Sequence, residues 1–377
     1  MNIVVAGWAA PLAAAPYFWH YASYVLGFTE LGHNAWLLDD PGDYPWGWDP
    51  VAEAVDPECR AGRAMVRDEM SRLGLGDRWF FRQLPDDVQD GLDRAAAADV
   101  LAEADVFVNV SCTTPMRPEY RRIPCRIAID TDPVFTQLAV RKGERPGLVD
   151  DHTRLFTFGR PPLPAQEHEW VPTRQPVAVR HWPVADVPSP GAPLTTVTTW
   201  QAYRPTSWDG IDYAGKDRSW LDYLDLPSKV AVPLHVALGG GEELATGRRV
   251  LREHGWGLLD TRDLTRSTAT YRSFIAASLG ELAVAKHAYV RARSGWFSER
   301  SCCYLASGRP VVLQNTGFGD WLPMGDGLLA FSTPAEAVAA VEAVAADPVH
   351  HAAAARKVVT EHFDAATVCA DLLEQAL

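Results

Sequence analysis

The chain has 377 residues, of which 47% are hydrophobic and 22% are charged. This length predicts two domains, and the composition is that of an ordinary globular protein with two sizeable cores. The net charge of −13 argues against a nucleic-acid partner or an anionic membrane surface, although it is compatible with a local basic pocket.

Cysteine usage and the N-terminal segment indicate a cytoplasmic protein. The six cysteines show neither CxxC nor paired metal-ligand spacing, so we expect buried thiols in a reducing compartment. Residues 1–29 contain no Lys, Arg, Asp or Glu, but they lack a basic leading segment and are interrupted by Pro11 and Pro16. We therefore expect no targeting signal and no membrane insertion.

The first domain opens with a predicted strand over 2–7, a loop that carries Trp8, a helix over about 17–32 and a second strand over 35–40. Apolar residues recur near helical spacing between Phe18 and Leu31. The first turn lacks the G-x-G-x-x-G pattern, which argues against a nicotinamide-dependent dehydrogenase.

Residues 41–50 are rich in Pro, Gly, Asp and Trp and predict a loop. Trp46 and Trp48 suit an apolar or ring-shaped acceptor molecule; packing over the domain edge explains them equally well.

Two further buried strands are predicted over 106–110 and 126–130, after an Ala-rich helix over 95–102. Polar residues follow both strands, among them Thr113 and Asp132. Because ligands of open α/β sheets bind beyond the carboxyl ends of the strands, these residues belong to the rim of a predicted cleft.

The density of Pro and Gly places the interdomain linker near 184–193. The second domain starts with a strand over 194–199, and Thr199 and Trp200 lie at its carboxyl end, facing the same cleft. We predict an N-terminal domain over 1–188, a C-terminal domain over 189–360 and a final helical segment over 361–377.

Residues 284–329 have the order strand, polar turn, helix, strand and polar loop. The run Tyr289–Ala292 is short enough to finish a strand. Ser298 is the expected N-cap of a helix that ends before Gly308, and Arg309–Gln314 is a β-branched, apolar run. Small hydroxylated residues at a helix start provide free N–H groups and a favourable dipole, so this turn predicts an anion site.

The phrase SGWFSERSCCYLASGRPVVLQNTGFGDWLP in this stretch resembles the donor-binding motif of a family of bacterial GT-B glycosyltransferases. A generic βαβ unit of a doubly wound protein is the alternative explanation. The phrase PTRQPV also resembles that family, so the likeness covers most of the chain. The resemblance implies an α/β protein of the GT-B fold, with two Rossmann-like domains facing a cleft and a last helix that crosses back to the first domain.

Sugar transfer from a nucleotide diphosphate sugar (UDP- or dTDP-linked) requires neutralisation of a diphosphate leaving group. Ser298, Arg300 and Ser301 are the candidates, with Lys286 or Arg293 as a second cation; for Arg300 a surface ion pair is the alternative. Glu299 either accepts ribose hydroxyls or caps its own helix, and Asp320 either binds sugar hydroxyls or caps a loop. The predicted donor-binding set is Thr199, Trp200, Lys286, Ser294, Gly295, Ser298, Glu299, Arg300, Ser301, Thr316, Gly317 and Asp320.

An inverting transfer also needs a base for the acceptor hydroxyl. His20, near the start of the first helix, is the first candidate and Asp132 the second; a packed helix histidine and a turn residue before Pro133 are the alternatives. The E-x7-E pattern of many retaining GT-B enzymes is absent around Glu299, which favours inversion. No DxD-type or His cluster indicates a metal, so we expect a metal-independent reaction without a cofactor.

The predicted function is therefore a hexosyltransferase-type glycosyltransferase that acts on a small natural product or a glycan, with Trp8, Trp46, Trp48 and Thr113 as acceptor-binding residues. A homodimer is compatible with this prediction. A nucleotide-sugar epimerase and a non-catalytic GT-B-like auxiliary protein are the alternatives. The high Ala content is typical of a GC-rich bacterial source.

Overall fold

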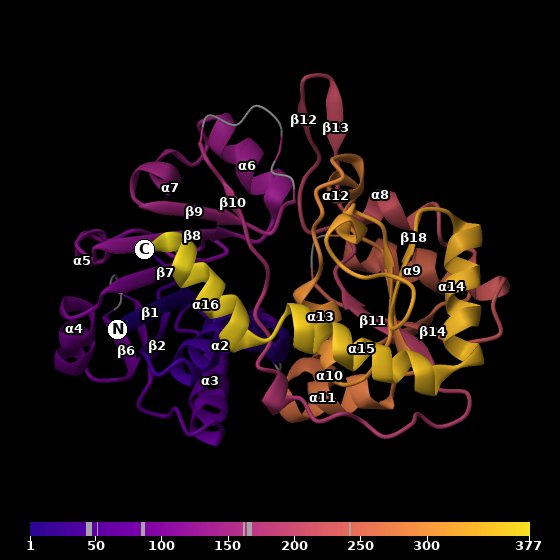
Figure 1. Cartoon of the computed structure of the whole chain (residues 1–377), viewed down its shortest axis with the longest axis horizontal. Coiled ribbons are helices and arrows are strands. Elements are labelled where there is room, and N and C mark those ends of the chain that lie inside the picture. Colours follow the sequence, from indigo (N-terminus) through magenta and orange to yellow (C-terminus); the bar gives the residue numbers. More distant parts are fainter. Residues whose placement is uncertain (43–46, 51, 84–86, 161–162, 164–167, 241–242) are drawn as a thin grey trace.

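The structure is a computed structural model that describes the chain except for residues 43–46, 51, 84–86, 161–162, 164–167 and 241–242. Two α/β units lie side by side, each with helices on both faces of its sheet (Figure 1). No helix among the described residues is both long and apolar enough to cross a membrane.

The sheet of the first unit has the strand order β10-β9-β8-β7-β1-β2-β5-β6 and is parallel except for β6. Its central strands are buried almost throughout, as expected when helices cover both faces. The strands are β1 (Asn2–Gly7), β2 (Asn34–Asp39), β5 (Trp79–Gln83), β6 (Val88–Gly91), β7 (Val106–Val110), β8 (Cys125–Asp130), β9 (Arg154–Thr157) and β10 (Val171–Pro172). The remaining elements are α1 (Ala9–Leu12), α2 (Ala15–Glu30), α3 (Arg60–Arg72), α4 (Arg94–Ala102), α5 (Pro118–Arg121), α6 (Pro133–Arg141), α7 (Pro146–Asp150) and the hairpin β3 (Trp48–Asp49)–β4 (Ala54–Val55).

The sheet of the second unit is wholly parallel, with the order β15-β14-β11-β16-β17-β18. Its strands are β11 (Leu194–Thr198), β14 (Leu234–Leu238), β15 (Gly257–Leu259), β16 (Gly280–Ala283), β17 (Val311–Gln314) and β18 (Leu328–Phe331). Its helices are α8 (Lys216–Trp220), α9 (Leu244–Glu253), α10 (Thr261–Thr265), α11 (Thr268–Ala277), α12 (His287–Arg291), α13 (Glu299–Ala306), α14 (Pro334–Ala346) and α15 (Pro348–His362). A hairpin of β12 (Thr206–Trp208) and β13 (Ile211–Tyr213) projects beyond this sheet (Figure 1).

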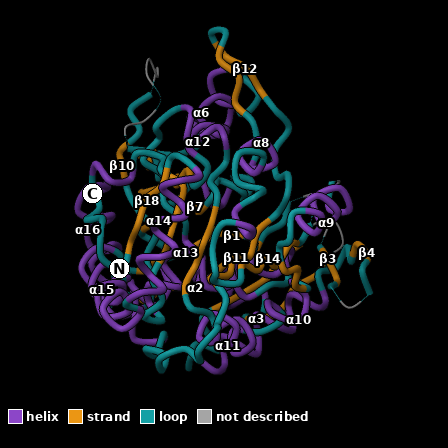
Figure 2. Tube along the Cα trace, turned by 90° about the vertical axis from the view of Figure 1, so that its right-hand side faces the viewer, coloured by secondary structure: helices purple, strands orange, loops and turns teal. Residues whose placement is uncertain are grey.

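The last helix, α16 (Ala365–Ala376), leaves the second unit and packs on α2 of the first, as predicted (Figures 1 and 2). Gly27 of α2 permits this approach, because a Cβ there would lie 2.6 Å from the carbonyl oxygen of Ala365. The backbone joins the same crossing, since the N–H of Val177 donates to the carbonyl of Phe363 at 2.7 Å.

Two predicted strands need correction. Tyr289 lies in helix α12 and not at the end of a strand, because β16 already ends at Ala283 and Ala288 and Tyr289 pack into the core. The apolar run over 230–237 also predicts a strand, but that strand, β14, starts only at Leu234, directly after Pro233.

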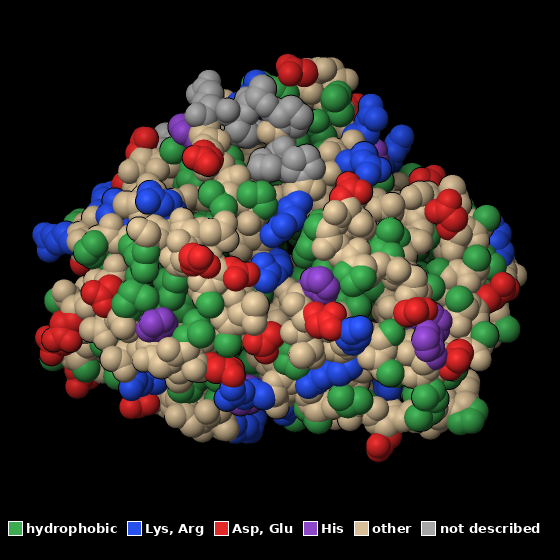
Figure 3. Space-filling view, viewed as in Figure 1, with side chains coloured by type: hydrophobic (Ala, Val, Ile, Leu, Met, Phe, Trp, Pro, Cys, Tyr) green, Lys and Arg blue, Asp and Glu red, His purple; other side chains and the backbone are tan. Residues whose placement is uncertain are grey.

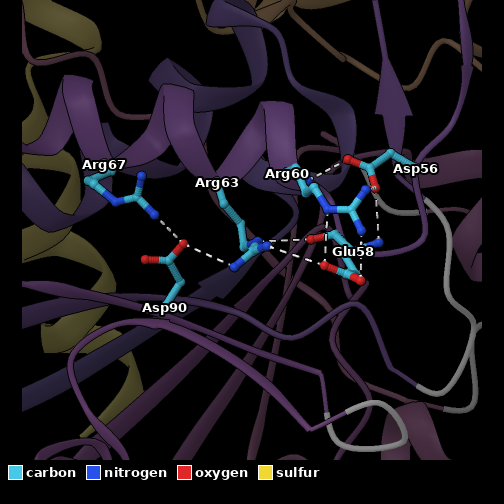
Figure 4. Close-up of polar contacts among 6 residues, drawn as sticks. All are labelled: Asp56, Glu58, Arg60, Arg63, Arg67 and Asp90. Carbon is cyan, nitrogen blue, oxygen red and sulfur yellow. Dashed lines mark hydrogen bonds and ion pairs between the residues drawn. The ribbon is translucent and has the colours of Figure 1, made fainter. Parts of the chain in front are cut away.

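Helix α3 forms ion pairs with β6, the strand at the outer edge of the first sheet (Figure 4). Arg63 and Arg67 both form ion pairs with Asp90 of β6, and Arg60 pairs with Glu58.

The same helix also reaches the second unit through a buried side chain, Glu69. Its carboxylate accepts hydrogen bonds from the backbone N–H of Thr268 at 3.0 Å and from the Thr268 hydroxyl at 2.7 Å, at the N-terminus of α11. A carboxylate satisfies the free N–H groups of a helix start, so this contact fixes the units relative to each other.

Candidate functional site

The candidate site lies where α13 and the carboxyl ends of β11 and β16 in the second unit face α2 and α6 of the first. Helix α13 starts where the sequence predicts, with Ser298 at the N-cap position and Gly308 left-handed (φ +68°) beyond its end. The Ser298 side chain makes no capping hydrogen bond, and the buried Ser301 hydroxyl has no partner among the described residues. The first turn of α13 therefore offers polar groups to a ligand.

Arg300 is buried in an ion pair and is not a surface residue. Its guanidinium binds the carboxylate of Glu281, a fully buried residue of β16, and donates from Nη1 to the carbonyl of Val197 at 2.9 Å. Burial acts to lower the pKa of Arg300, but the Glu281 carboxylate outweighs it, so the guanidinium stays charged. Arg300 is thereby fixed beside the end of β11.

Lys216 is a second buried cation at the same place. Its Nζ donates to the Thr198 hydroxyl at 2.8 Å, next to the carbonyl that Arg300 binds. Burial, together with the positive charges of Arg300 and Lys286, lowers the pKa of Lys216 to about 7. No carboxylate forms an ion pair with this ammonium within the part of the chain that the structure describes.

Lys286 is the third cation, and its ion-pair partner belongs to the first unit. Its Nζ forms an ion pair with Asp132, which also accepts from the hydroxyls of Tyr289 and, at 3.0 Å, Tyr203. Burial acts to raise the pKa of Asp132, but the Lys286 charge and these hydrogen bonds prevail, so the pKa lies below its ordinary value. The two candidates Asp132 and Lys286 thus form one contact across the two units.

His20 lies in the second turn of α2, because that helix starts at Ala15, with Pro16 in its first turn. Its Nε2 is 3.2 Å from the Ser111 hydroxyl, which also accepts from Thr131 at 2.9 Å. Its Nδ1 is buried and has no partner among the described residues. Burial lowers the pKa of His20, against the opposing charges of Glu299 and Asp132, so the ring is neutral at pH 7.

His20 and the start of α13 share one small cavity of about 10 Å³, lined in part by His20, Glu299 and Arg300. Ligand pockets usually measure roughly 300–1,000 Å³. This cavity by itself is therefore too small for a nucleotide sugar.

Four of the predicted donor residues lie in two loops that are hydrogen-bonded to each other. Gly295 (φ +67°) donates to the carbonyl of Thr316 at 2.8 Å, and the Thr316 hydroxyl donates to the carbonyl of Trp296. Gly295 also approaches the first unit, because a Cβ there would lie 2.2 Å from the carbonyl oxygen of Arg160. The other two members, Ser294 and Gly317, lie in the same pair of loops.

Other predicted residues lie outside this cluster. Trp200 packs in the core against Trp220, and Thr199 lies beside Gly240. Arg293 and Asp320 are exposed and 3.4 Å apart.

The predicted acceptor residues are dispersed. Trp8 packs partly against the core, and Thr113 is half-buried after β7. Trp48 is 43% exposed on the β3–β4 hairpin, and Trp46 lies outside the described residues.

Sequence reasoning assigned no role to Glu281, Lys216, Tyr203 or Ser111. A signal existed for Glu281, because a lone carboxylate in an apolar strand run requires a partner. Ser111 adopts a left-handed backbone (φ +60°), which local sequence does not reveal. Among the described residues, no group of three or more His, Cys, Asp or Glu is arranged to hold a metal ion.

No protein-family model and no curated protein matches this sequence. Solved structures are similar over almost the whole chain. An alpha-glucosyltransferase (AGT) bound to UDP and a 13-mer DNA is 10% identical, with a TM-score of 0.61. The match covers 99% of this chain and 98% of the AGT chain. AviGT4, a glycosyltransferase involved in avilamycin A biosynthesis, is 15% identical, with a TM-score of 0.52. The match covers 99% of this chain and 96% of the AviGT4 chain. HepE from Anabaena, bound to UDP-glucose, is 12% identical, with a TM-score of 0.54. The match covers 99% of this chain and 98% of the HepE chain. At these identities the likeness shows the fold, which is GT-B.

Proposed function

We propose that this chain is a glycosyltransferase that transfers a hexose from a nucleotide diphosphate sugar without a metal ion. The observation that carries the proposal is the meeting of Arg300, Lys216 and Lys286 beside the N-terminus of α13. The GT-B fold supports it, as do the nucleotide ligands of the similar structures: UDP in AGT and UDP-glucose in HepE.

The cations and the helix start suit a leaving diphosphate. Carboxylates form ion pairs with Arg300 and Lys286, whereas Lys216 donates to a hydroxyl and forms no ion pair among the described residues. Burial and the two neighbouring cations outweigh the more remote charges of Glu299 and Glu281 on Lys216. A bound diphosphate supplies the missing negative charge, and the Ser298 and Ser301 hydroxyls with the α13 N–H groups supply donors. Glu299 lines the cavity at the start of α13, and we assign to it hydrogen bonds from the hydroxyls of the nucleoside or the sugar.

In the proposed transfer the acceptor oxygen attacks the anomeric carbon as the bond from that carbon to the diphosphate oxygen breaks. The electron pair of that bond leaves with the diphosphate, and the proton of the acceptor hydroxyl passes to His20. When Nε2 carries the proton that faces Ser111, Nδ1 holds a lone pair and is the basic atom. This route inverts the anomeric centre.

Asp132 is less suited to the role of base. Lys286 and two tyrosine hydroxyls bind its carboxylate, and its lowered pKa makes it a weak proton acceptor at pH 7. We assign to Asp132 the positioning of Lys286, which stands beside the proposed diphosphate.

The first test is a thermal-shift titration with UDP, dTDP and other nucleoside diphosphates. We expect at least one to raise the melting temperature by several degrees at 100 times its dissociation constant, where the linkage term is about 2.7 kcal/mol. Lys216→Met should lose most of the shift. If no nucleoside diphosphate shifts the wild-type chain, the donor site is refuted and a non-catalytic auxiliary role is favoured. A mass-spectrometric screen of donor hydrolysis then identifies the sugar.

Nucleotide binding should depend on pH through Lys216. A diphosphate favours the charged ammonium, so binding takes up a proton near pH 7, and affinity falls by about tenfold for each pH unit above 7. Calorimetry between pH 7 and 9, in buffers of different ionisation enthalpy, measures both effects. The matched variant Lys216→Met should bind weakly and without this pH dependence. An affinity of the wild-type chain that stays constant up to pH 9 would contradict the role of Lys216.

A further inference from the structure

A groove of about 410 Å³ lies between helix α6 of the first unit and the segment Tyr203–Thr206 of the second. Its volume falls in the range of small-molecule sites. Both units contribute a wall, so the groove has this shape only while the units are in contact. None of the residues predicted from the sequence to bind donor or acceptor lines it.

Positive charge gathers in this groove although the whole protein is acidic. Lys142, Arg145 and Arg204 line it, against one carboxylate, that of Glu144. The Lys142 ammonium contacts the hydroxyl of Thr206, and Arg145 donates to the carbonyl of Cys112 at 2.5 Å. Arg204 is exposed and has no hydrogen-bond or ion-pair partner among the described residues. Among the described residues, none of these three cations forms an ion pair with a carboxylate, and such a cluster of positive charge attracts an anion.

Two stacked aromatic side chains line the groove. Phe135 and Tyr203 stack with ring centroids 4.3 Å apart and an interplanar angle of 11°. Tyr203 is 37% exposed as a residue, so part of its surface is available to a planar or ring-shaped ligand. Cations beside an aromatic surface suit a molecule that carries both a ring and an anionic group.

The same tyrosine connects the groove to the proposed reaction centre. The Tyr203 hydroxyl donates to Asp132, which binds Lys286 and whose charge acts on His20. A ligand that fills the groove therefore lies beside the contact between Asp132 and Lys286, which joins the two units. This is the position expected of the distal part of an acceptor whose reacting hydroxyl points toward His20.

We propose that the groove between α6 and Tyr203–Thr206 binds an anionic group, a phosphate or a carboxylate, of the acceptor substrate. The assignment to the acceptor rests on the function proposed above, whereas the binding of an anion in the groove does not. The proposal names the substrate class as a ring-bearing molecule with a negative charge at the end remote from its reacting hydroxyl.

Phenyl phosphate is the probe, titrated by calorimetry at low salt into the full chain with and without saturating UDP. We expect binding that UDP does not change and that Arg204→Glu weakens by about tenfold or more. The matched control is Arg252→Glu, an equal change of charge at an exposed residue of α9, a helix that lies away from α6 in Figures 1 and 2. It should change the affinity by less than twofold, and phenol should not bind measurably.

Three results would overturn the anion site: displacement of phenyl phosphate by UDP, equal effects of the two variants, or equal binding of phenol. The acceptor role has its own measurement. Once transfer to any acceptor is observed, phenyl phosphate should inhibit in competition with the acceptor and not with the donor. The reverse pattern would refute that role. If UDP does not bind at all, the proposed function fails, and the comparison of Arg204→Glu with Arg252→Glu still decides whether the groove binds anions.

Discussion

Replacing His20 with alanine is expected to slow sugar transfer by a factor of about 10² to 10⁴ while nucleotide binding stays unchanged. The imidazole contacts Ser111 and lines the cavity at the start of α13, but it makes no ion pair with the cations that would hold the diphosphate. The loss should therefore appear in kcat and leave the UDP-induced thermal shift intact. Single-turnover transfer with a saturating donor measures the chemical step.

The pH dependence gives an independent signature of His20. Burial lowers its pKa, so the neutral, basic form persists below the ordinary histidine range. We expect the acidic limb of the kcat profile to lie below pH 6.5 in the wild-type chain and to vanish in His20→Ala.

Asp132→Asn is the comparison variant that separates the two candidate bases. If Asp132 were the base, this variant would lose the chemical step and His20→Ala would retain it. Unchanged turnover in His20→Ala would remove His20 from the mechanism.

Replacing Arg300 with methionine is expected to destabilise the fold by about 3–5 kcal/mol and to abolish stabilisation by nucleotide. The first effect arises because Glu281, fully buried in β16, would keep its charge without its partner. The second arises because Arg300 lies beside the proposed diphosphate site. Denaturant unfolding with and without UDP measures both.

Two further variants separate these effects. In Arg300→Met/Glu281→Gln the unpaired carboxylate is gone, so most of the stability should return while the UDP response stays absent. Arg309→Met is the matched control, because Arg309 is also a buried arginine of the second unit, bound to the carbonyls of Ala276 and Asp186. It should lose stability and keep the UDP response. A UDP response in the double variant would show that Arg300 has only a structural role.

Nucleotide binding must also accommodate the contacts between the units. Asp132 with Lys286, and Glu69 with Thr268, both join the two units, and the cavity between α2 and α13 is far smaller than a nucleotide sugar. The groove beside Tyr203 lies on the same boundary, because the Tyr203 hydroxyl donates to Asp132.

Local sequence determined much of the fold. The strands over 2–7 and 106–110, the start of α13 at Ser298 and the start of α14 after Thr333 follow from runs of apolar residues and from helix caps, which act over a few residues. Local pattern also predicted that polar residues follow the strands at their carboxyl ends, and these ends share one edge of a parallel sheet.

Only the tertiary structure decided how those polar residues are used. It buried Arg300 against Glu281, brought Lys216 beside both, bound Asp132 to Lys286 and placed Arg293 and Asp320 at the surface. The partners in these contacts come from different elements of the chain. The balance between burial and charge that sets their pKa values depends on distances in space, which spacing along one sequence does not contain.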